Sequence, residues 1–322
     1  MTWRSRHMLS ALGLAVALAP ATVFTQAPAA AARAWKAPRT AWGHPDLQGY
    51  WTNTTTTPLQ RPLDLKDKAV LTDAELAERD RLVAERANQD QAPSAGNPGT
   101  YNDAWYERGS LNRRTSLIID PEDGRLPPLT PDAKQRAEDE RRGRGPADSW
   151  TDRSVYERCI TRGLPGAMMP GFYNHNYHIL QTPDHVVIRV EMIHDARIIA
   201  LGGRTPLPGG IRQWMGSSRG HWEGETLVVE TTNFNDKVRE QSLIAFSSGQ
   251  NLRLVERFTR TAADTIDYQF TVTDPTFYTR PWTASIPMAR FEGPLYEYAC
   301  HEGNYGLAGI LAGARAEERG DK

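Results

Sequence analysis

The feature that most constrains this chain is a series of short β-type runs joined by tight turns, which fills its second half. The run 265–273 shows the pattern most clearly, because Ile266, Tyr268, Phe270 and Val272 fall on one face of a strand and polar residues on the other. Successive strands with such short connections pair as an antiparallel meander, and closing into a barrel removes the exposed edges of the sheet. The sequence therefore predicts a mainly β fold with an antiparallel barrel, and a two-sheet sandwich is the alternative.

The other expected strands follow one another along the same half of the chain, and Thr182-Pro183-Asp184 and Gly224 are typical turn signals between them. A final helix is expected over 307–317, where apolar residues form one stripe. The remaining strand-like runs are 173–181, 186–194, 197–201, 221–223, 226–232, 252–260, 282–288 and 295–300.

Residues 34–150 differ in character, being rich in proline and charge, with strand-like runs at 47–51 and 116–120. Thr72 and Glu75 form a capping box for a helix that continues to about residue 89. Thr130 and Pro131 open a second helix by the rule of a cap followed by proline. Both helices are highly charged, which is typical of solvated surfaces. We expect this segment to wrap around the barrel without forming a core of its own.

The first 33 residues have the layout of a secretory signal peptide. Two arginines precede an apolar run over 8–24, and small residues suited to a cleavage site follow it. A membrane anchor would need about 20 clean apolar residues, and Pro20 interrupts this run. Removal of 1–33 would leave the wrapping segment 34–150 and the barrel with its C-terminal helix in 151–322. The sequence thus predicts a periplasmic or secreted protein without a later membrane span.

The chain has two cysteines, Cys159 and Cys300. In an oxidising compartment they would most simply form one disulfide. Closing a loop of this length would stabilise the fold by about 4–5 kcal/mol in the chain-entropy model. A catalytic thiol is the alternative.

Composition and motifs narrow the class of partner. The 38 Lys and Arg residues balance 39 Asp and Glu residues, so the basic surplus of a nucleic-acid binder is missing. The sequence contains neither a P-loop nor a dinucleotide fingerprint, and neither a Gly-x-Ser-x-Gly elbow nor a His-Glu-x-x-His helix. These observations argue against nucleotide-dependent chemistry and an α/β-hydrolase. We predict a small-molecule ligand or substrate, and no organic cofactor.

Histidines gather in the expected hairpin 173–194. If the hairpin turns about Pro183 and Asp184, residues whose numbers add to 367 lie opposite one another. One face then pairs His178 with Arg189 and Asn176 with Glu191, an arrangement of acid, base and amide groups suited to proton transfer. The alternative interpretation of this face is a solvated outer wall.

The second face of the hairpin carries Tyr173, His175 and Tyr177, opposite a strand end that bears His194. Tyrosine and histidine on an otherwise apolar strand pair are typical of a ligand cavity. The alternative is an ordinary core face whose polar atoms are satisfied internally.

Two further groups of residues are candidates. His301 and Glu302 follow Cys300, and Gly303 allows a turn that could bring both side chains to one site. Arg204 and Trp214 lie on a glycine- and proline-rich loop, where they could bind an anionic or aromatic ligand. Ordinary surface turns and surface packing are the alternative interpretations.

Two functions are consistent with these residues. The first is an acid/base isomerase, lyase or hydrolase acting in the barrel cavity, and the second is a non-catalytic carrier of an apolar or aromatic molecule. A divalent metal held by His175, His178, His194, His301 and Glu191 is a further alternative, although residues 175 and 178 face opposite sides of a straight strand. The candidate catalytic residues are His194, Glu191, His178, His301 and Glu302, and the candidate substrate-binding residues are Tyr173, His175, Asn176, Tyr177, Arg204 and Trp214.

Five sequence blocks are spread from the start of the wrapping segment to the last helix: PDLQGYW (45–51), EMIHDARII (191–199), WEGETLVVETTNFN (222–235), DPTFYTRPW (274–282) and YACHEGNYG (298–306). Together they resemble a group of exported bacterial lipocalin-like proteins. The resemblance covers essentially the whole chain after the leader. It implies a barrel and export, and it implies no reaction.

Overall fold

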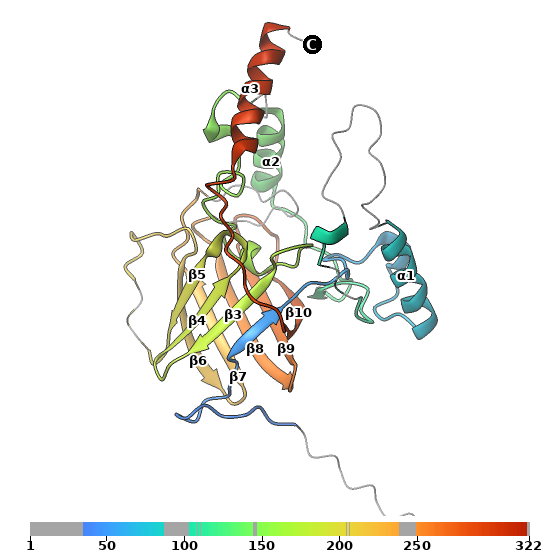
Figure 1. The fold of residues 1–322 in the computed structure, drawn as a ribbon, viewed down its shortest axis with the longest axis vertical. Helices are drawn as coiled ribbons and strands as arrows, with labels where there is room; N and C mark the ends of the chain where they lie inside the picture. Colours follow the sequence, from blue (N-terminus) through green and yellow to red (C-terminus); the bar gives the residue numbers. More distant parts are fainter. Residues whose placement is uncertain are drawn as a thin grey trace, which may run out of the picture. The chain divides into compact units, whose positions relative to one another are not determined.

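A closed nine-stranded β-barrel is the central element of the computed structural model (Figure 1). The structure describes residues 35–86, 103–107, 109, 111–143, 147–203, 205, 207–237 and 249–320. The predicted leader and Arg204 therefore lie outside the described residues. The strands are β1 (Gly49–Thr52), β2 (Ile118–Asp120), β3 (Asn176–Gln181), β4 (His185–Val190), β5 (Ala196–Ala200), β6 (Ser217–Glu223), β7 (Thr226–Thr232), β8 (Arg253–Ala262), β9 (Thr265–Thr273) and β10 (Trp282–Arg290), and the α-helices are α1 (Asp73–Arg86), α2 (Pro131–Gly143) and α3 (Tyr305–Arg319).

The barrel closes through β1, which pairs with β3 on one side and with β10 on the other. Trp51 lies opposite Arg290 in the closing pair. Its indole is fully buried and donates a hydrogen bond to the carbonyl oxygen of Leu47 over 2.9 Å. The segment expected only to wrap the barrel thus also contributes a barrel strand. β2 pairs antiparallel with β10 and is not one of the nine strands of the closed barrel.

Two-residue periodicity sorts the side chains as predicted. In β9, Ile266, Tyr268, Phe270 and Val272 are all buried. The hairpin of β3 and β4 has the predicted register, with Tyr177 opposite Val190. The barrel prediction, including the C-terminal helix, is confirmed.

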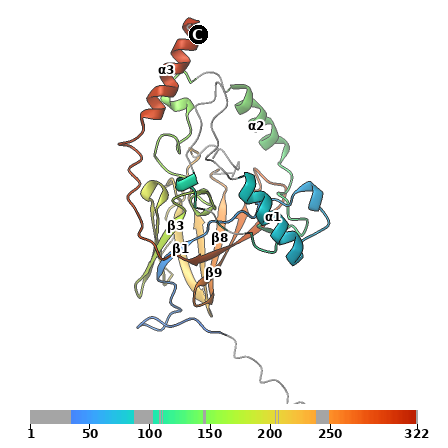
Figure 2. The same cartoon turned by 45° about the vertical axis from the view of Figure 1, so that its right-hand side comes forward.

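Three details of the predicted meander differ. β5 and β6 pair in parallel, through Ala200 and Arg219, because the long connection between them returns the chain to the same end of the sheet. β4 ends at Val190, so the expected strand does not reach His194. Residues 295–300 form no strand in the described structure, since β1 and β10 pair with each other and close the edge they would join. The segment instead runs along the barrel wall toward α3 (Figures 1 and 2).

A segment that we call the plug, residues 161–172, packs on the barrel end where β3 begins. Its apolar side chains, including Leu164 and Met168, belong to the same buried core as the inward-facing strand residues. Polar contacts also join it to the barrel: the Tyr177 hydroxyl donates to the Ala167 carbonyl oxygen over 3.3 Å, the Asn53 amide donates to the Met168 carbonyl oxygen over 2.7 Å, and the Thr161 hydroxyl donates to the Asp195 carboxylate over 2.8 Å. The plug therefore covers this end of the barrel with buried side chains.

The helices begin where their capping signals place them. The Thr72 backbone N–H donates to Glu75 over 2.9 Å, and the Glu75 N–H donates to the Thr72 hydroxyl over 3.3 Å, which is the predicted capping box at α1. The Ala133 N–H donates to the Thr130 hydroxyl over 3.2 Å at the start of α2. In the ranges that the structure describes, none of the helices combines the length and apolar character needed to span a bilayer.

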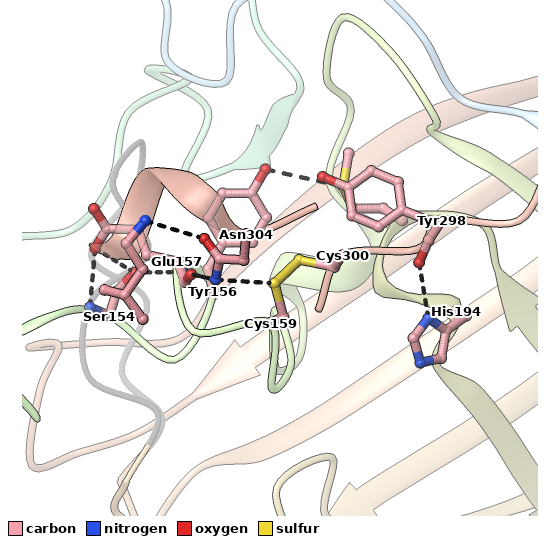
Figure 3. The surroundings of a disulfide bond; sticks show 10 residues. Ser154, Tyr156, Glu157, Cys159, His194, Tyr298, Cys300 and Asn304 are labelled. Carbon is pink, nitrogen blue, oxygen red and sulfur yellow. Dashed lines mark hydrogen bonds between the residues drawn. A yellow bond between two sulfur atoms is a disulfide. The ribbon is translucent and has the colours of Figure 1, made fainter. Parts of the chain in front are cut away.

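Cys159 and Cys300 form the predicted disulfide (Figure 3). It joins the chain just before the plug to the segment just before α3. The Asn304 amide donates to the Glu157 carbonyl oxygen over 2.8 Å and so supports the same junction. A disulfide of this kind fits an oxidising, exported environment.

Candidate functional site

Several predicted site residues meet at the barrel end that the plug covers, and Asn176 lies at their centre. Its side chain is 1% exposed. The Asn176 amide nitrogen donates to Glu191 over 2.7 Å and to Glu107 over 3.2 Å. The second oxygen of Glu191 accepts from the backbone N–H of Tyr296 over 2.8 Å. One buried amide thus holds two carboxylates, which come from segments far apart in the sequence.

Glu107 was not among the predicted residues. It also accepts a hydrogen bond from the Asn174 N–H over 3.2 Å. Burial raises the pKa of the Glu107 carboxyl group, and the nearby charge of Glu191 adds to the effect. Glu107 lies in an irregular segment 69 residues before Asn176, so no periodicity in the sequence relates the two. Only the folded chain brings this acid to the site.

His175 is buried beside an arginine of the plug. Its Nε2 lies 3.0 Å from Nη1 of Arg162. Burial lowers the pKa of His175 to about 3, and the charge of Arg162 contributes, so the imidazole is neutral near pH 7. Gly171 packs against the ring, since a Cβ atom there would lie 1.9 Å from Nε2. His175 is thus a fixed, neutral hydrogen-bonding group.

The structure places His178 on the outer wall, as the alternative interpretation of that face proposed. Its ring stacks on Tyr50 with 4.3 Å between centroids. Burial and the neighbouring Arg189 lower the pKa of His178. The predicted position of His178 opposite Arg189 is confirmed. The His178 imidazole is not one of the described groups that bind the buried Asn176 amide, which are Glu107 and Glu191.

His194 does not share a strand face with His175. Ile193 and His194 have φ angles of 60° and 49°, so the chain turns in the left-handed region directly after β4 and the strand pattern ends. His194 is exposed, and its Nδ1 lies 3.1 Å from the Tyr298 carbonyl oxygen (Figure 3). The described structure therefore does not bring His194 together with Glu191, which is buried and bound to amides.

The other candidates lie apart from this cluster. His301 and Glu302 are exposed in the turn before α3, and neither side chain makes a hydrogen bond with any described residue. Trp214 is half-buried in the connection between β5 and β6. Tyr173 is half-buried and packs against the barrel core.

The metal alternative has no assembled ligand set in the part of the chain that the structure describes. No group of three histidine, cysteine or acidic side chains there has a geometry that could hold an ion. His175 is buried at the barrel end, whereas His178 faces outward. The two imidazoles are separated in the way that the strand periodicity predicted.

A second polar cluster, which the sequence analysis missed, lies inside the barrel. Arg197 on β5 and Glu256 on β8 form a bidentate ion pair, with 2.9 Å between Nη1 and Oε1. The Tyr268 hydroxyl on β9 donates to the same Oε1 over 2.9 Å. Ser218 on β6 lies 3.4 Å from Nη2 of Arg197, and its hydroxyl lies 2.8 Å from that of Thr231 on β7. We call Arg197, Glu256 and Tyr268 the inner network.

The inner network is removed from solvent. Arg197 is 3% exposed, and Glu256 and Tyr268 are 0% exposed. Burial alone would lower the pKa of Arg197, but the adjacent Glu256 carboxylate produces a net increase. Burial and Glu256 raise the pKa of the Tyr268 hydroxyl, which therefore remains a donor. The Nε–H of Arg197 is buried and has no acceptor among the described residues.

Aromatic rings surround this network. Tyr268 stacks between Phe258 and Phe270, with centroid distances of 4.7 and 5.7 Å. The interior also contains buried large side chains from several other strands, among them Trp51, Tyr177 and Trp282. A polar group held here would meet fixed charges in an apolar setting, where electrostatic interactions are stronger than in water.

One signal in the sequence could have revealed the inner network. Glu256 lies between Leu254 and Phe258 on the apolar side of an alternating strand, and Arg197 lies two residues before the buried Ile199. Charged residues are almost never fully buried unless they are paired. Opposite charges at inward positions of two strands therefore indicate an internal ion pair.

Comparison of the chain with protein-family models, curated proteins and solved structures gives no match. Two clusters of polar side chains are therefore the candidate functional sites: the carboxylates around Asn176 and the inner network. The first is made of carboxylates bound to backbone and amide donors, around a buried Asn176 Oδ1 that has no donor among the described residues. The second contains a buried donor without an acceptor in an aromatic interior.

Proposed function

We propose that this protein is an exported, lipocalin-like binder of a small apolar or aromatic molecule, held in the barrel interior against the inner network. The observation that supports this is the buried Nε–H of Arg197, which lacks an acceptor. An unpaired buried donor costs about 1–3 kcal/mol. An oxygen or ring nitrogen of a ligand at this position would remove that cost.

The energetics of the ion pair favour recognition as its role. Replacing a buried ion pair by apolar residues is often neutral or stabilising, so a gain in stability is not the expected reason for Arg197 and Glu256. A fixed pair can instead orient the polar group of a ligand, while aromatic rings contact its apolar part. The inner network would thus supply a polar anchor inside the barrel, which distinguishes a carrier site from an ordinary core.

Export supports the same function. The leader over residues 1–33, the disulfide and the resemblance to exported lipocalin-like proteins all agree with action outside the cytoplasm.

Native mass spectrometry of the exported protein should show a co-purifying molecule, and 6-propionyl-2-dimethylaminonaphthalene, a neutral aromatic ketone whose carbonyl oxygen can accept from the Arg197 Nε–H, should bind with enhanced fluorescence. The double variant Arg197→Met/Glu256→Met should weaken probe binding at least tenfold, in line with about 1.4 kcal/mol per tenfold change. The matched control is Arg253→Met/Glu230→Met, which removes an exposed bidentate pair from neighbouring strands. Wild-type affinity in the folded inner variant would refute the proposal.

An acid/base enzyme is the second candidate, because Glu107 has a raised pKa and shares the Asn176 amide with Glu191. General acids work best when their pKa lies near the operating pH, and an isomerase, lyase or hydrolase could use such a group. Carbon-13 NMR of the carboxyl carbons would measure the titration, with Glu107→Gln to assign the signal. Titration at the ordinary value for glutamate would eliminate this candidate.

A further inference from the structure

Arg162 is a half-buried cation in the plug, and it has an unusual set of neighbours. Its Nη1 contacts His175 at 3.0 Å, and its Cζ lies 5.4 Å from the ring centre of Tyr156. Its Nε–H is buried without an acceptor among the described residues. Arg153, nine positions earlier, also has a buried Nε–H without an acceptor, but its charge is paired with Glu157. Within the described chain, Arg162 has no such partner.

The groups that contact the Arg162 guanidinium group in the described structure, His175 and Tyr156, supply no negative charge. His175 is neutral near pH 7 and can accept a hydrogen bond without supplying negative charge. Burial raises the pKa of the Tyr177 hydroxyl, so this neighbour is also uncharged. The two acids of the barrel end, Glu107 and Glu191, bind the Asn176 amide and backbone N–H groups. A partly desolvated cation without a partner is costly.

The backbone on either side of Arg162 is anchored. The Thr161 hydroxyl donates to the Asp195 carboxylate over 2.8 Å, and it accepts a hydrogen bond from the Gly163 N–H over 3.0 Å. The disulfide at Cys159 holds the chain three residues earlier. The guanidinium group is therefore positioned before any ligand arrives, which lowers the entropy cost of binding.

We propose that Arg162 binds the oxyanion, a carboxylate or sulfonate group, of the molecule that the barrel holds; this rests on the proposed carrier function. The fork of a guanidinium group matches the two oxygens of such an anion. His175 and Tyr156 occupy one edge and one face of the guanidinium group and leave other N–H groups available. The ligand class is thus narrowed from apolar or aromatic molecules to those with an acidic end.

The test uses the full mature chain and two probes of similar aromatic size. One is 1-anilinonaphthalene-8-sulfonate, which carries a sulfonate, and the other is neutral N-phenyl-1-naphthylamine. Arg162→Met should weaken binding of the sulfonate probe about 10- to 100-fold and change binding of the neutral probe less than twofold. Arg162→Lys keeps the positive charge but lacks the fork of the guanidinium group. Its affinity for the sulfonate probe should lie between those of wild type and Arg162→Met.

Arg158→Met is the matched control, because Arg158 lies four positions earlier and stacks on Trp150 at 4.5 Å. It should leave both affinities unchanged. Equal affinities for the sulfonate probe in wild type and Arg162→Met would overturn the role of Arg162, while binding of the neutral probe would still support the carrier. Equal loss of both probes in Arg162→Met would also overturn it, since that result indicates a structural role. If the wild type binds neither of the two probes, the proposed carrier function itself is refuted.

Discussion

Two arginine–glutamate pairs, which share strand β8, lie on opposite sides of the barrel wall and differ mainly in their exposure to water. Arg197 and Glu256 pair inside, with side chains 1% and 0% exposed. Arg253 and Glu230 pair outside, with side chains 50% and 48% exposed. Both pairs are bidentate. Because β8 supplies Arg253 and Glu256, the comparison separates the effect of burial from that of strand and pair type.

Exposure to water determines how much each pair contributes to the free energy of unfolding. The outer charges are solvated with or without their partner, so the outer pair contributes at most about 1 kcal/mol. The inner charges have lost their hydration, and each depends on the other. The same pair of side chains is therefore nearly dispensable on one side of the wall and strongly coupled on the other.

The largest expected effect is the loss of one inner partner. Glu256→Gln should lower the free energy of unfolding by about 3–5 kcal/mol, because it leaves the buried Arg197 charge unpaired. Glu230→Gln should lower it by no more than about 1 kcal/mol. Urea denaturation of both variants measures the difference. Similar values for the two variants would show that burial does not distinguish the pairs.

The double replacement sharpens the same comparison. Arg197→Met/Glu256→Met removes both charges, so the loss of about 3–5 kcal/mol in the single variant should be recovered, apart from about 1–3 kcal/mol for the Tyr268 hydroxyl, which loses its acceptor. The same urea experiment provides the measurement. A double variant as unstable as Glu256→Gln would mean that the inner pair stabilises the barrel, contrary to the recognition role proposed for it.

A smaller effect is expected at Tyr268, the third member of the inner network. Tyr268→Phe removes the hydroxyl that donates to Glu256 over 2.9 Å. Hydrogen bonds to charged groups contribute about 1.5–3 kcal/mol, and the buried ring itself is retained. Thermal unfolding by circular dichroism should show a correspondingly lower midpoint. An unchanged midpoint would indicate that Glu256 finds another donor.

The smallest effect concerns pH and the outer pair. The hydrogen bond from Arg253 lowers the pKa of Glu230 in the folded state. The stabilisation is thus fully present above the unfolded value of about 4.3 and is lost as the pH falls through the folded value. Between pH 5 and pH 3, wild type should lose more stability than Glu230→Gln, by less than about 1 kcal/mol. Parallel losses would show that the outer pair contributes nothing measurable.

Local patterns accounted for much of the fold. The hairpin register around Pro183 and Asp184 followed from a turn signal and a two-residue period, and Tyr177 indeed lies opposite Val190. The capping box at Thr72 and Glu75 was equally predictable. These features depend on residues close in sequence, so short segments determine them.

The candidate site was predicted only in part. His175, Asn176 and Glu191 were identified as polar groups of one hairpin, and the structure places them at one barrel end. The role assigned to His194 depended on a strand that continued past Val190. The left-handed turn at Ile193 ends that strand, and no local pattern in the sequence predicts this turn.

The sequence by itself determined the strand alternation, the helix starts and the disulfide between Cys159 and Cys300, because each depends on a short pattern or on the presence of only two thiols. Only the tertiary structure decided that Arg197 meets Glu256 across 59 residues and that β1 closes the barrel. Such contacts depend on how strands curve around a shared interior and on which charges lose their water there. These contacts therefore depend on the packing of the whole chain, and no single segment of the sequence predicts them.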